Sequence, residues 1–295
     1  MTSNNSSSGK FSDFFKVLPQ YFLPHHFLSS WMYRLTRITW RPLKNLAIKA
    51  VIRLYDVDMK QAQINNIEQF TSFNDFFTRE LKPEARPLCA GQHSIACPVD
   101  GRISQIGKIE NEDIFQAKGQ SFSLTNLLGG SQQDANAFLN GNFTTIYLSP
   151  RDYHRIHMPF NGRLERMLHI PGRLFSVNPA TTRRVPGLFA RNERVVSIFS
   201  TDIGPMAVIL VGAIFVSSMD TVWAGTITPS RSKNIRAWQY EPQGEQAIYL
   251  NKGDELGRFN MGSTVILLFG ENQMQWLENL NAGDPVEMGM LLGTK

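Results

Sequence analysis

Residues 252–269 read KGDELGRFNMGSTVILLF, and the stretch changes character at Gly262. The first part is polar and contains three glycines, whereas STVILLF (263–269) is almost continuously apolar. A short apolar run next to glycines is typical of a buried strand. The stretch therefore predicts a glycine-rich approach to Gly262-Ser263-Thr264, followed by a strand.

Further short strands are expected on the N-terminal side of this stretch. From about residue 85 onward, Gly, Pro and Asn separate short apolar runs: FTTIYL (143–148), RLERMLHI (163–170), ERVVSIF (193–199), MAVILVGAIFV (206–216) and TVWAGTIT (221–228). Strands at this spacing indicate a β-rich domain of the sandwich or barrel-like kind. SFSLTNLLGG (121–130) is the one short helix expected within that domain.

Helical patterns are concentrated nearer the N-terminus. Pro24 and Pro42 each suit the first turn of a helix, and the apolar residues after them recur at helical spacing. A short third helix is expected in TSFNDFFTREL (71–81), where Ser72 is placed to cap it. With the strands, these helices predict an α+β protein.

The net charge of +5 is unevenly distributed along the 295 residues. Residues 10–60 contain nine Lys or Arg and three Asp residues, so the basic character belongs to this segment. Helices with aromatic and apolar faces flanked by basic residues suit the surface of an anionic membrane. A helical hairpin packed on the domain is the alternative, and nucleic acid is disfavoured because no base-reading motif accompanies the charge.

These patterns divide the chain into three parts. Residues 1–9 are expected to be a disordered tail, residues 10–60 a basic amphipathic helical segment that docks on a membrane, and residues 61–295 a β-rich catalytic domain. The longest apolar run, residues 206–216, is too short to span a bilayer as a helix. The two cysteines, Cys89 and Cys97, do not form a disulfide framework and suit a reducing compartment.

Three stretches contain residues that are able to perform chemistry. PVDGRI (98–103) places Asp100 between Val99 and Gly101, SPRDYHRIHMP (149–159) contains two histidines, and the third stretch contains Ser263. An Asp, a His and a Ser can form an orienting group, a base and a nucleophile. On residue types alone, a turn aspartate, a structural histidine and a loop serine are equally ordinary readings.

Two other kinds of site fit the sequence poorly. His154 and His157 are three residues apart, but Pro150 and Pro159 bracket them and no Cys or Glu completes a zinc-binding spacing, so no metal is expected. A serine hydrolase with a nucleophile elbow would contain GxSxG, which is absent from the sequence.

Seven motifs in a fixed order resemble the phosphatidylserine decarboxylase proenzyme family of the short bacterial-like type. They are FFTRELKPEARPL (76–88), PVDGRI (98–103), FSLTNLLG (122–129), YHRIHMP (153–159), PGRLFSVN (171–178), LFARNERVV (188–196) and KGDELGRFNMGST (252–264). Family members often read LGST where this chain reads MGST. Met replaces Leu with little change in volume and leaves the Gly-Ser pair intact.

The resemblance implies that the chain cuts its own backbone between Gly262 and Ser263. Ser263 would attack the carbonyl of Gly262, with His157 as the base and Asp100 as the carboxylate that orients His157. The products would be residues 1–262, the beta chain, and residues 263–295, the alpha chain. Ser263 would become a covalent pyruvoyl group, the only cofactor expected.

The resemblance also implies the second reaction. The pyruvoyl ketone would form a Schiff base with phosphatidylserine and accept the electrons released with carbon dioxide, giving phosphatidylethanolamine for phospholipid biosynthesis. His154 would assist proton transfer in this step. The expected location is the cytoplasmic side of the cell membrane, with peripheral attachment and a homodimeric assembly. A pyruvoyl enzyme acting on a soluble amino acid and a non-catalytic membrane-binding β domain are the alternatives.

Overall fold

The computed structural model describes residues 17–117, 119–214, 216, 218–230, 232–261 and 264–295. Over these residues the protein is α+β, with antiparallel sheets and short helices, as the sequence predicted. The helices are η1 (Leu18–Tyr21), α2 (His25–Leu35), α3 (Arg41–Tyr55), η2 (Met59–Gln61), α4 (Phe73–Phe77), η3 (Pro83–Ala85), α5 (Leu124–Leu127), α6 (Gln132–Asn136), α7 (Pro179–Thr182) and α8 (Leu188–Arg191). The scissile pair expected at 262–263 and the tail expected at 1–9 lie outside the described residues.

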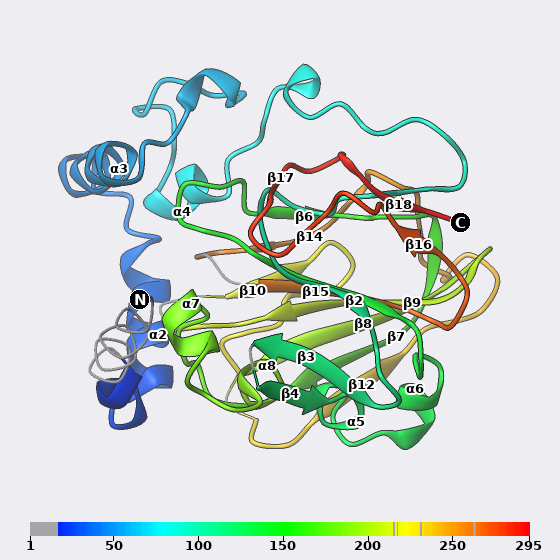
Figure 1. Cartoon of the computed structure of the whole chain (residues 1–295). Coiled ribbons are helices and arrows are strands. Elements are labelled where there is room, and N and C mark those ends of the chain that lie inside the picture. The colour runs from blue at the N-terminus through cyan, green and yellow to red at the C-terminus, as the bar shows by residue number, and fades with distance from the viewer. Residues whose placement is uncertain (1–16, 118, 215, 217, 231, 262–263) are drawn as a thin grey trace, which may run out of the picture.

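A nine-stranded antiparallel sheet forms the body of the protein (Figure 1). Eight strands follow one another in the order β12 (Arg236–Gln239), β7 (Gly162–Ile170), β8 (Arg194–Thr201), β9 (Gly204–Val211), β15 (Thr264–Phe269), β5 (Asn142–Tyr147), β2 (Gly101–Lys108) and β17 (Pro285–Val286). The ninth strand, β13 (Tyr249–Leu250), pairs with β7.

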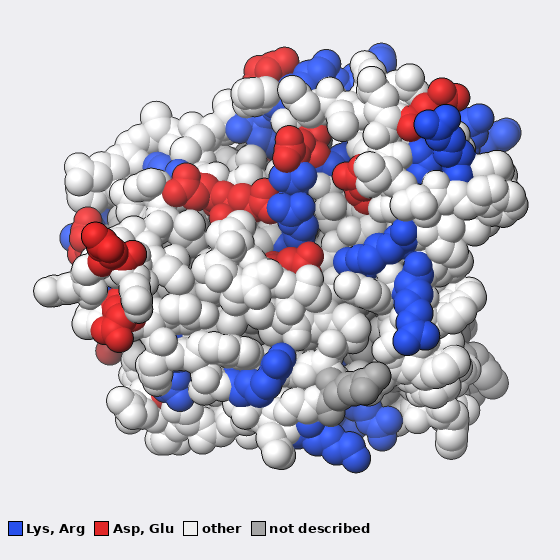
Figure 2. Space-filling model, turned by 180° about the vertical axis from the view of Figure 1, so that it is seen from behind, with Lys and Arg blue, Asp and Glu red and all other residues white. Residues whose placement is uncertain are grey.

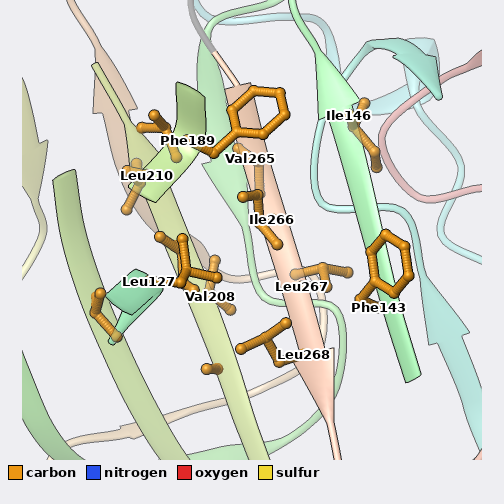
Figure 3. Packing of buried hydrophobic residues seen from close by; sticks show 14 of the residues in the cluster. Leu127, Phe143, Ile146, Phe189, Val208, Leu210, Val265, Ile266, Leu267 and Leu268 are labelled. Atoms are coloured by element: carbon orange, nitrogen blue, oxygen red, sulfur yellow. The ribbon is translucent and has the colours of Figure 1, made fainter. Parts of the chain in front are cut away.

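Strand β15 lies at the centre of this sheet, between β9 and β5. All six of its residues are buried because both faces of the strand are covered. Figure 3 shows Val265, Ile266, Leu267 and Leu268 packed among apolar side chains of the neighbouring strands and of helices α5 and α8. This packing fixes the position at which the chain enters the strand, at Thr264.

Three smaller sheets complete the fold. The one closest to the expected site has the order β11 (Gly225–Thr226), β10 (Met219–Thr221), β14 (Glu255–Phe259) and β6 (Arg155–His157). The others are β1 (Ser94–Ala96), β18 (Leu291–Thr294) and β16 (Gln275–Trp276), and the hairpin of β3 (Asp113–Ala117) and β4 (Gln120–Ser123).

Two of the predicted strands are shorter than expected. The apolar run 206–216 leaves the sheet after Val211, and the chain turns where the amide of Val216 bonds to the carbonyl of Ala213. The run 221–228 does not form one strand, because Gly225 adopts a left-handed φ of 65° and folds the chain into the β10–β11 hairpin.

The three N-terminal helices expected from the sequence are present. Pro24 is the N-cap residue of α2, Pro42 is in the first turn of α3, and the Ser72 hydroxyl accepts a hydrogen bond from the amide of Asp75 at the start of α4. Helices α2, α3 and α4 lie together at one side of the sheet (Figure 1). None of the described helices is long and apolar enough to cross a membrane.

A second apolar cluster joins helices α3 and α4 to the rest of the chain. Ile48 and Val57 pack with Phe70, Phe73, Phe76 and Phe77, and Met261 lies against the same cluster. The segment before residue 60 is thus packed on the domain through one face, as in the helical-hairpin alternative. Large apolar side chains remain exposed elsewhere on the segment, among them Phe22, Phe27, Trp31, Trp40, Leu46 and Leu54.

Candidate active site

The chain on each side of residues 262–263 is firmly positioned. Before them, the amide of Phe259 at the end of β14 bonds to the carbonyl of His154 at 3.0 Å. After them, Thr264 pairs with Tyr147 on β5 and Val211 on β9. Buried strand pairs of this kind hold the backbone in a single register. The Oγ1 atom of Thr264 is buried and has no hydrogen-bond partner within the described part of the chain.

Asn260, two residues before Gly262, connects this segment to α4 and β10. Its backbone amide donates to the carbonyl of Ser218 at 2.9 Å, and its side-chain Nδ2 donates to Oδ2 of Asp220 at 2.8 Å. The side chain of Asn74 donates to Oδ1 of Asn260 at 2.8 Å, and the amide of Asn74 donates to the carbonyl of Thr36. Because Asn260 is fully buried, these bonds fix the approach to the expected cleavage site.

His157 lies at the end of β6 and is held at both ring nitrogens. Nδ1 lies 2.8 Å from the carbonyl oxygen of Gly253, which can only accept, so Nδ1 is the atom that carries the hydrogen. Nε2 is then free to accept from the Tyr153 hydroxyl, 3.0 Å away. Burial lowers the pKa of His157, so the imidazole is neutral near pH 7. His157 therefore has the protonation state of a base.

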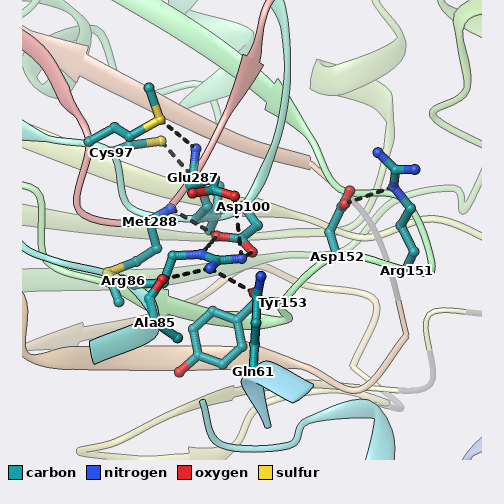
Figure 4. Close-up of polar contacts among 12 residues, drawn as sticks. Gln61, Ala85, Arg86, Cys97, Asp100, Arg151, Asp152, Tyr153, Glu287 and Met288 are labelled. Carbon is teal, nitrogen blue, oxygen red and sulfur yellow. Dashed lines mark hydrogen bonds and ion pairs between the residues drawn. The ribbon is translucent and has the colours of Figure 1, made fainter. Parts of the chain in front are cut away.

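Asp100 lies in a different set of contacts, drawn in Figure 4. The Arg86 guanidinium donates two hydrogen bonds to its carboxylate, one from Nε to Oδ1 at 2.8 Å and one from Nη2 to Oδ2 at 2.5 Å. The amide of Met288 donates to Oδ1 at 2.8 Å. Asp100 was expected to orient His157, but no hydrogen bond joins the two side chains: Nδ1 of His157 is bonded to the Gly253 carbonyl and Nε2 to the Tyr153 hydroxyl. Asp100 acts on His157 only through its charge, which raises the pKa of His157 more weakly than burial lowers it.

His154 is completely enclosed. Its Nδ1 donates to the carbonyl of Asp152 at 2.8 Å, which leaves the lone pair on Nε2, and Nε2 has no partner among the described residues. The ring packs against Phe77 with 4.1 Å between centroids. Burial, reinforced by the nearby Arg79 charge, lowers the pKa of His154 to about 3. His154 thus has a buried ring nitrogen, Nε2, whose lone pair is able to accept a hydrogen bond or a proton.

Sequence analysis did not single out Tyr153, Arg86 or Asn260 as site residues. All three lie in motifs that it quoted. Tyr153 contacts His157 only four positions away, whereas Arg86 and Asn260 contact residues farther along the chain. Arg86 lies 14 positions from Asp100, and Asn260 lies 186 positions from Asn74. The structure joins these motifs into a site with two neutral histidines: Nε2 of His157 bonds to the Tyr153 hydroxyl, and Nε2 of His154 has no partner among the described residues.

Comparison with known proteins identifies the family of this chain. A family model described as phosphatidylserine decarboxylase matches residues 73–294, and a second, described as PSD, matches residues 15–56. The chain is 54% identical over 275 residues to the phosphatidylserine decarboxylase proenzyme of Methylococcus capsulatus, which covers 93% of this chain and 94% of that protein. It is 52% identical over 282 residues to the protein of the same name from Bordetella pertussis, covering 96% and 95%. This chain belongs to the phosphatidylserine decarboxylase family.

Proposed function

We propose that the chain is a proenzyme that cleaves itself and then decarboxylates phosphatidylserine to phosphatidylethanolamine. The observation that carries this proposal is about 50% identity, over almost the whole length, to proteins named phosphatidylserine decarboxylase proenzyme. The site supports it, because two neutral histidines lie in the segment paired with the strand that leads to residue 261.

Self-cleavage is proposed at the bond between Gly262 and Ser263. His157 accepts the hydroxyl proton of Ser263 through Nε2 while the serine oxygen attacks the Gly262 carbonyl carbon, and the peptide becomes an ester. Elimination then releases residues 1–262 and leaves residues 263–295. The Tyr153 hydroxyl must leave Nε2 before that atom takes the proton, since one lone pair cannot accept both. Asp100 contributes a negative charge that favours the imidazolium.

The residues around the start of β15 fit a covalent pyruvoyl group derived from Ser263. His154 Nε2 and Thr264 Oγ1 are both buried and have no hydrogen-bond partner among the residues that the structure describes, so polar atoms are available to such a group. A pyruvoyl group supplies an electrophilic carbonyl that withdraws electrons from the bond that breaks. His154, neutral through its lowered pKa, takes up through Nε2 a proton that the ammonium group of the substrate releases, and later returns it to the carbon that has lost carbon dioxide.

A membrane surface is the proposed location, with peripheral attachment on the cytoplasmic side of the cell membrane. The described N-terminal helices combine exposed Phe27, Trp31 and Trp40 with basic residues. On the face in Figure 2, Lys and Arg side chains predominate toward the side of these helices, whereas Asp and Glu gather at the opposite edge. The homodimer and the sandwich or barrel-like closure of the sheets remain predictions.

The experiment measures carbon dioxide release by the purified protein from phosphatidylserine in vesicles and from free serine. Release of carbon dioxide from phosphatidylserine in vesicles, but not from free serine, supports the proposal. Release from free serine at an equal or greater kcat/KM would assign the chain to the soluble-substrate alternative. A protein that binds vesicles, stays uncut and releases nothing would be the non-catalytic domain.

A further inference from the structure

A path of hydrogen bonds through Ser218 connects the end of helix α2 with Asn260, two positions before Gly262. Arg37 follows α2 in the chain, and its Nη2 donates to Oγ of Ser218 at 3.2 Å. Nδ2 of Asn260 donates to the same oxygen. A serine hydroxyl oxygen has two lone pairs, and here both accept hydrogen bonds from segments far apart in the sequence. The fully buried Ser218 therefore joins the end of α2 to the segment before Gly262.

Arg37 is held in one orientation by its own helix. Its Nη1 donates to the carbonyl of Tyr33 at 3.2 Å, and its guanidinium lies 3.7 Å from the centroid of the Tyr33 ring. Burial lowers the pKa of Arg37 whereas the charge of Asp220 raises it, and an arginine stays charged in either case. Because the guanidinium is planar and rigid, these contacts also fix the direction in which Nη2 donates to Ser218.

A second path reaches Asn260 from the same end of α2. The backbone amide of Asn74 in α4 donates to the carbonyl of Thr36, the C-cap residue of α2, at 2.8 Å. Nδ2 of Asn74 donates to Oδ1 of Asn260 at 2.8 Å. The orientation of the Asn260 amide is fixed, because its Nδ2 also donates to the carboxylate of Asp220, which accepts. Oδ1 and Nδ2 of Asn260 are thus each connected to the end of α2 through one intermediate residue.

The position of Asn260 bears directly on self-cleavage. The oxygen of Ser263 has to approach the carbonyl carbon of Gly262, so the backbone must be held on both sides of this pair. On the C-terminal side, Thr264 is held by its strand pairs. On the N-terminal side, the bonds of Asn260 have the corresponding effect. A misplacement of about 1 Å between reacting groups is enough to cost about 10²-fold in rate.

We propose that the end of α2 positions the segment before Gly262 for self-cleavage, with Arg37 acting through Ser218 and Thr36 acting through Asn74. The inference rests on the proposed function, because it assumes that the chain cuts itself at this place. Maturation then depends on how α2 packs on the domain, in addition to any contact of the helix with a membrane. Decarboxylation should depend much less on these bonds, since after the cut the segment is no longer joined to residue 263.

The test removes the donor of Arg37. Arg37→Met eliminates the guanidinium but keeps an unbranched side chain that is able to pack on Tyr33. Ser218→Ala removes the shared acceptor oxygen. Arg34→Met is the matched control, because it makes the same change on the same helix at an exposed position.

Two rates are compared for each protein. Self-cleavage is followed by pulse-labelling during cell-free synthesis and denaturing electrophoresis. Decarboxylation is measured as kcat/KM per processed chain, with phosphatidylserine in micelles of an uncharged detergent. A separate measurement uses the uncut Ser263→Ala protein, with and without each arginine substitution, and follows amide hydrogen exchange in residues 255–261.

The proposal expects Arg37→Met and Ser218→Ala to slow self-cleavage at least about tenfold more than they lower kcat/KM per processed chain. Arg34→Met should leave the cleavage rate unchanged. Amide exchange in residues 255–261 should be faster with Arg37→Met than with Arg34→Met, because the bonds that hold Asn260 are weakened.

A normal cleavage rate in folded Arg37→Met and Ser218→Ala proteins would overturn the proposal. Equal losses in cleavage and in decarboxylation per processed chain would also overturn it, because the bonds would then serve the stability of the fold alone. If the wild-type chain neither cut itself nor released carbon dioxide, the proposed function would fail. The exchange measurement would still decide whether α2 holds the segment, and equal exchange in the two arginine variants would show that it does not.

Discussion

The hydroxyl of Tyr153 lies 3.0 Å from Nε2 of His157, and the two rings stack with 5.6 Å between centroids. The carbonyl of Gly253 fixes the hydrogen on Nδ1, so Tyr153 donates to the lone pair that a base would use. Tyr153 therefore determines how His157 is oriented and when its basic nitrogen is free. Desolvation raises the pKa of the Tyr153 hydroxyl, which keeps it protonated as a donor.

Replacing Tyr153 by Phe should slow self-cleavage. The change removes one hydrogen bond, worth about 0.5–1.5 kcal/mol, and leaves the ring stacking in place. If the bond orients His157 for the reaction, the cleavage rate should fall about 2- to 12-fold. The measurement is a time course of chain cleavage by denaturing electrophoresis. Faster cleavage in Tyr153→Phe would mean that the hydroxyl restrains the base.

Replacing His157 and replacing His154 should impair different reactions of the protein. His157→Ala should remain mostly one uncut chain, because the proposed base for Ser263 is gone. His154→Ala should still cut itself but lose about 10²–10⁴-fold in decarboxylation, the usual contribution of an acid–base group. Cleavage and carbon dioxide release are followed for each variant. If His154→Ala stayed uncut while His157→Ala cut itself normally, the roles of the two histidines would be exchanged. If both variants cleaved and decarboxylated normally, the histidines would have a structural role only.

Removing the Arg86 side chain should reduce stability and slow self-cleavage, because it leaves the Asp100 carboxylate without its ion-pair partner. Both side chains are more than nine-tenths buried, and breaking such an ion pair from one side typically costs 3–5 kcal/mol. We expect Arg86→Met to lower the free energy of unfolding by about that amount and to slow self-cleavage. The double variant with Asp100→Asn should recover part of the stability. Denaturant unfolding measures both, and simple additivity of the two changes would show that the pair is not coupled.

The free energy of unfolding should fall as pH falls below about 6.5. Burial lowers the pKa of His154 from 6.5 to about 3, so between these values the unfolded chain binds a proton that the folded chain does not. The slope from His154 alone is about 1.4 kcal/mol per pH unit. Unfolding is measured in Ser263→Ala protein, which stays one chain, with and without His154→Gln. Equal slopes from pH 6 to pH 4 would show that His154 titrates normally.

Much of the fold was predictable because its main strands are buried on both faces. The runs that became β5, β8 and β15 are buried along almost their whole length and mark strands directly, whereas β7 contains charged residues and leaves Glu165 exposed. The split of 221–228 was not predicted, because it depends on the left-handed backbone at Gly225. The apolar groove between α2, α3 and α4 was not predictable either, since these helices and Met261 come together only in the tertiary fold.

The candidate site was predictable in its residues more than in its contacts. Motifs identified Asp100, His154 and His157, because the resemblance assigns roles by position. Which groups hold these side chains depends on hydrogen bonds between segments far apart in the sequence, such as Gly253 with His157. The sequence therefore led us to pair Asp100 with His157, whereas the carboxylate is held by Arg86.

An intact-mass spectrum of the purified protein tests the central claim, self-cleavage with conversion of Ser263, most directly. The account predicts two chains, residues 1–262 and a smaller chain starting at position 263. The mass of the smaller chain should be lower than that of a serine-ended peptide by one NH₃, because the amino group is lost when the pyruvoyl group forms. A fully active preparation that contained only the intact 295-residue chain would contradict the account.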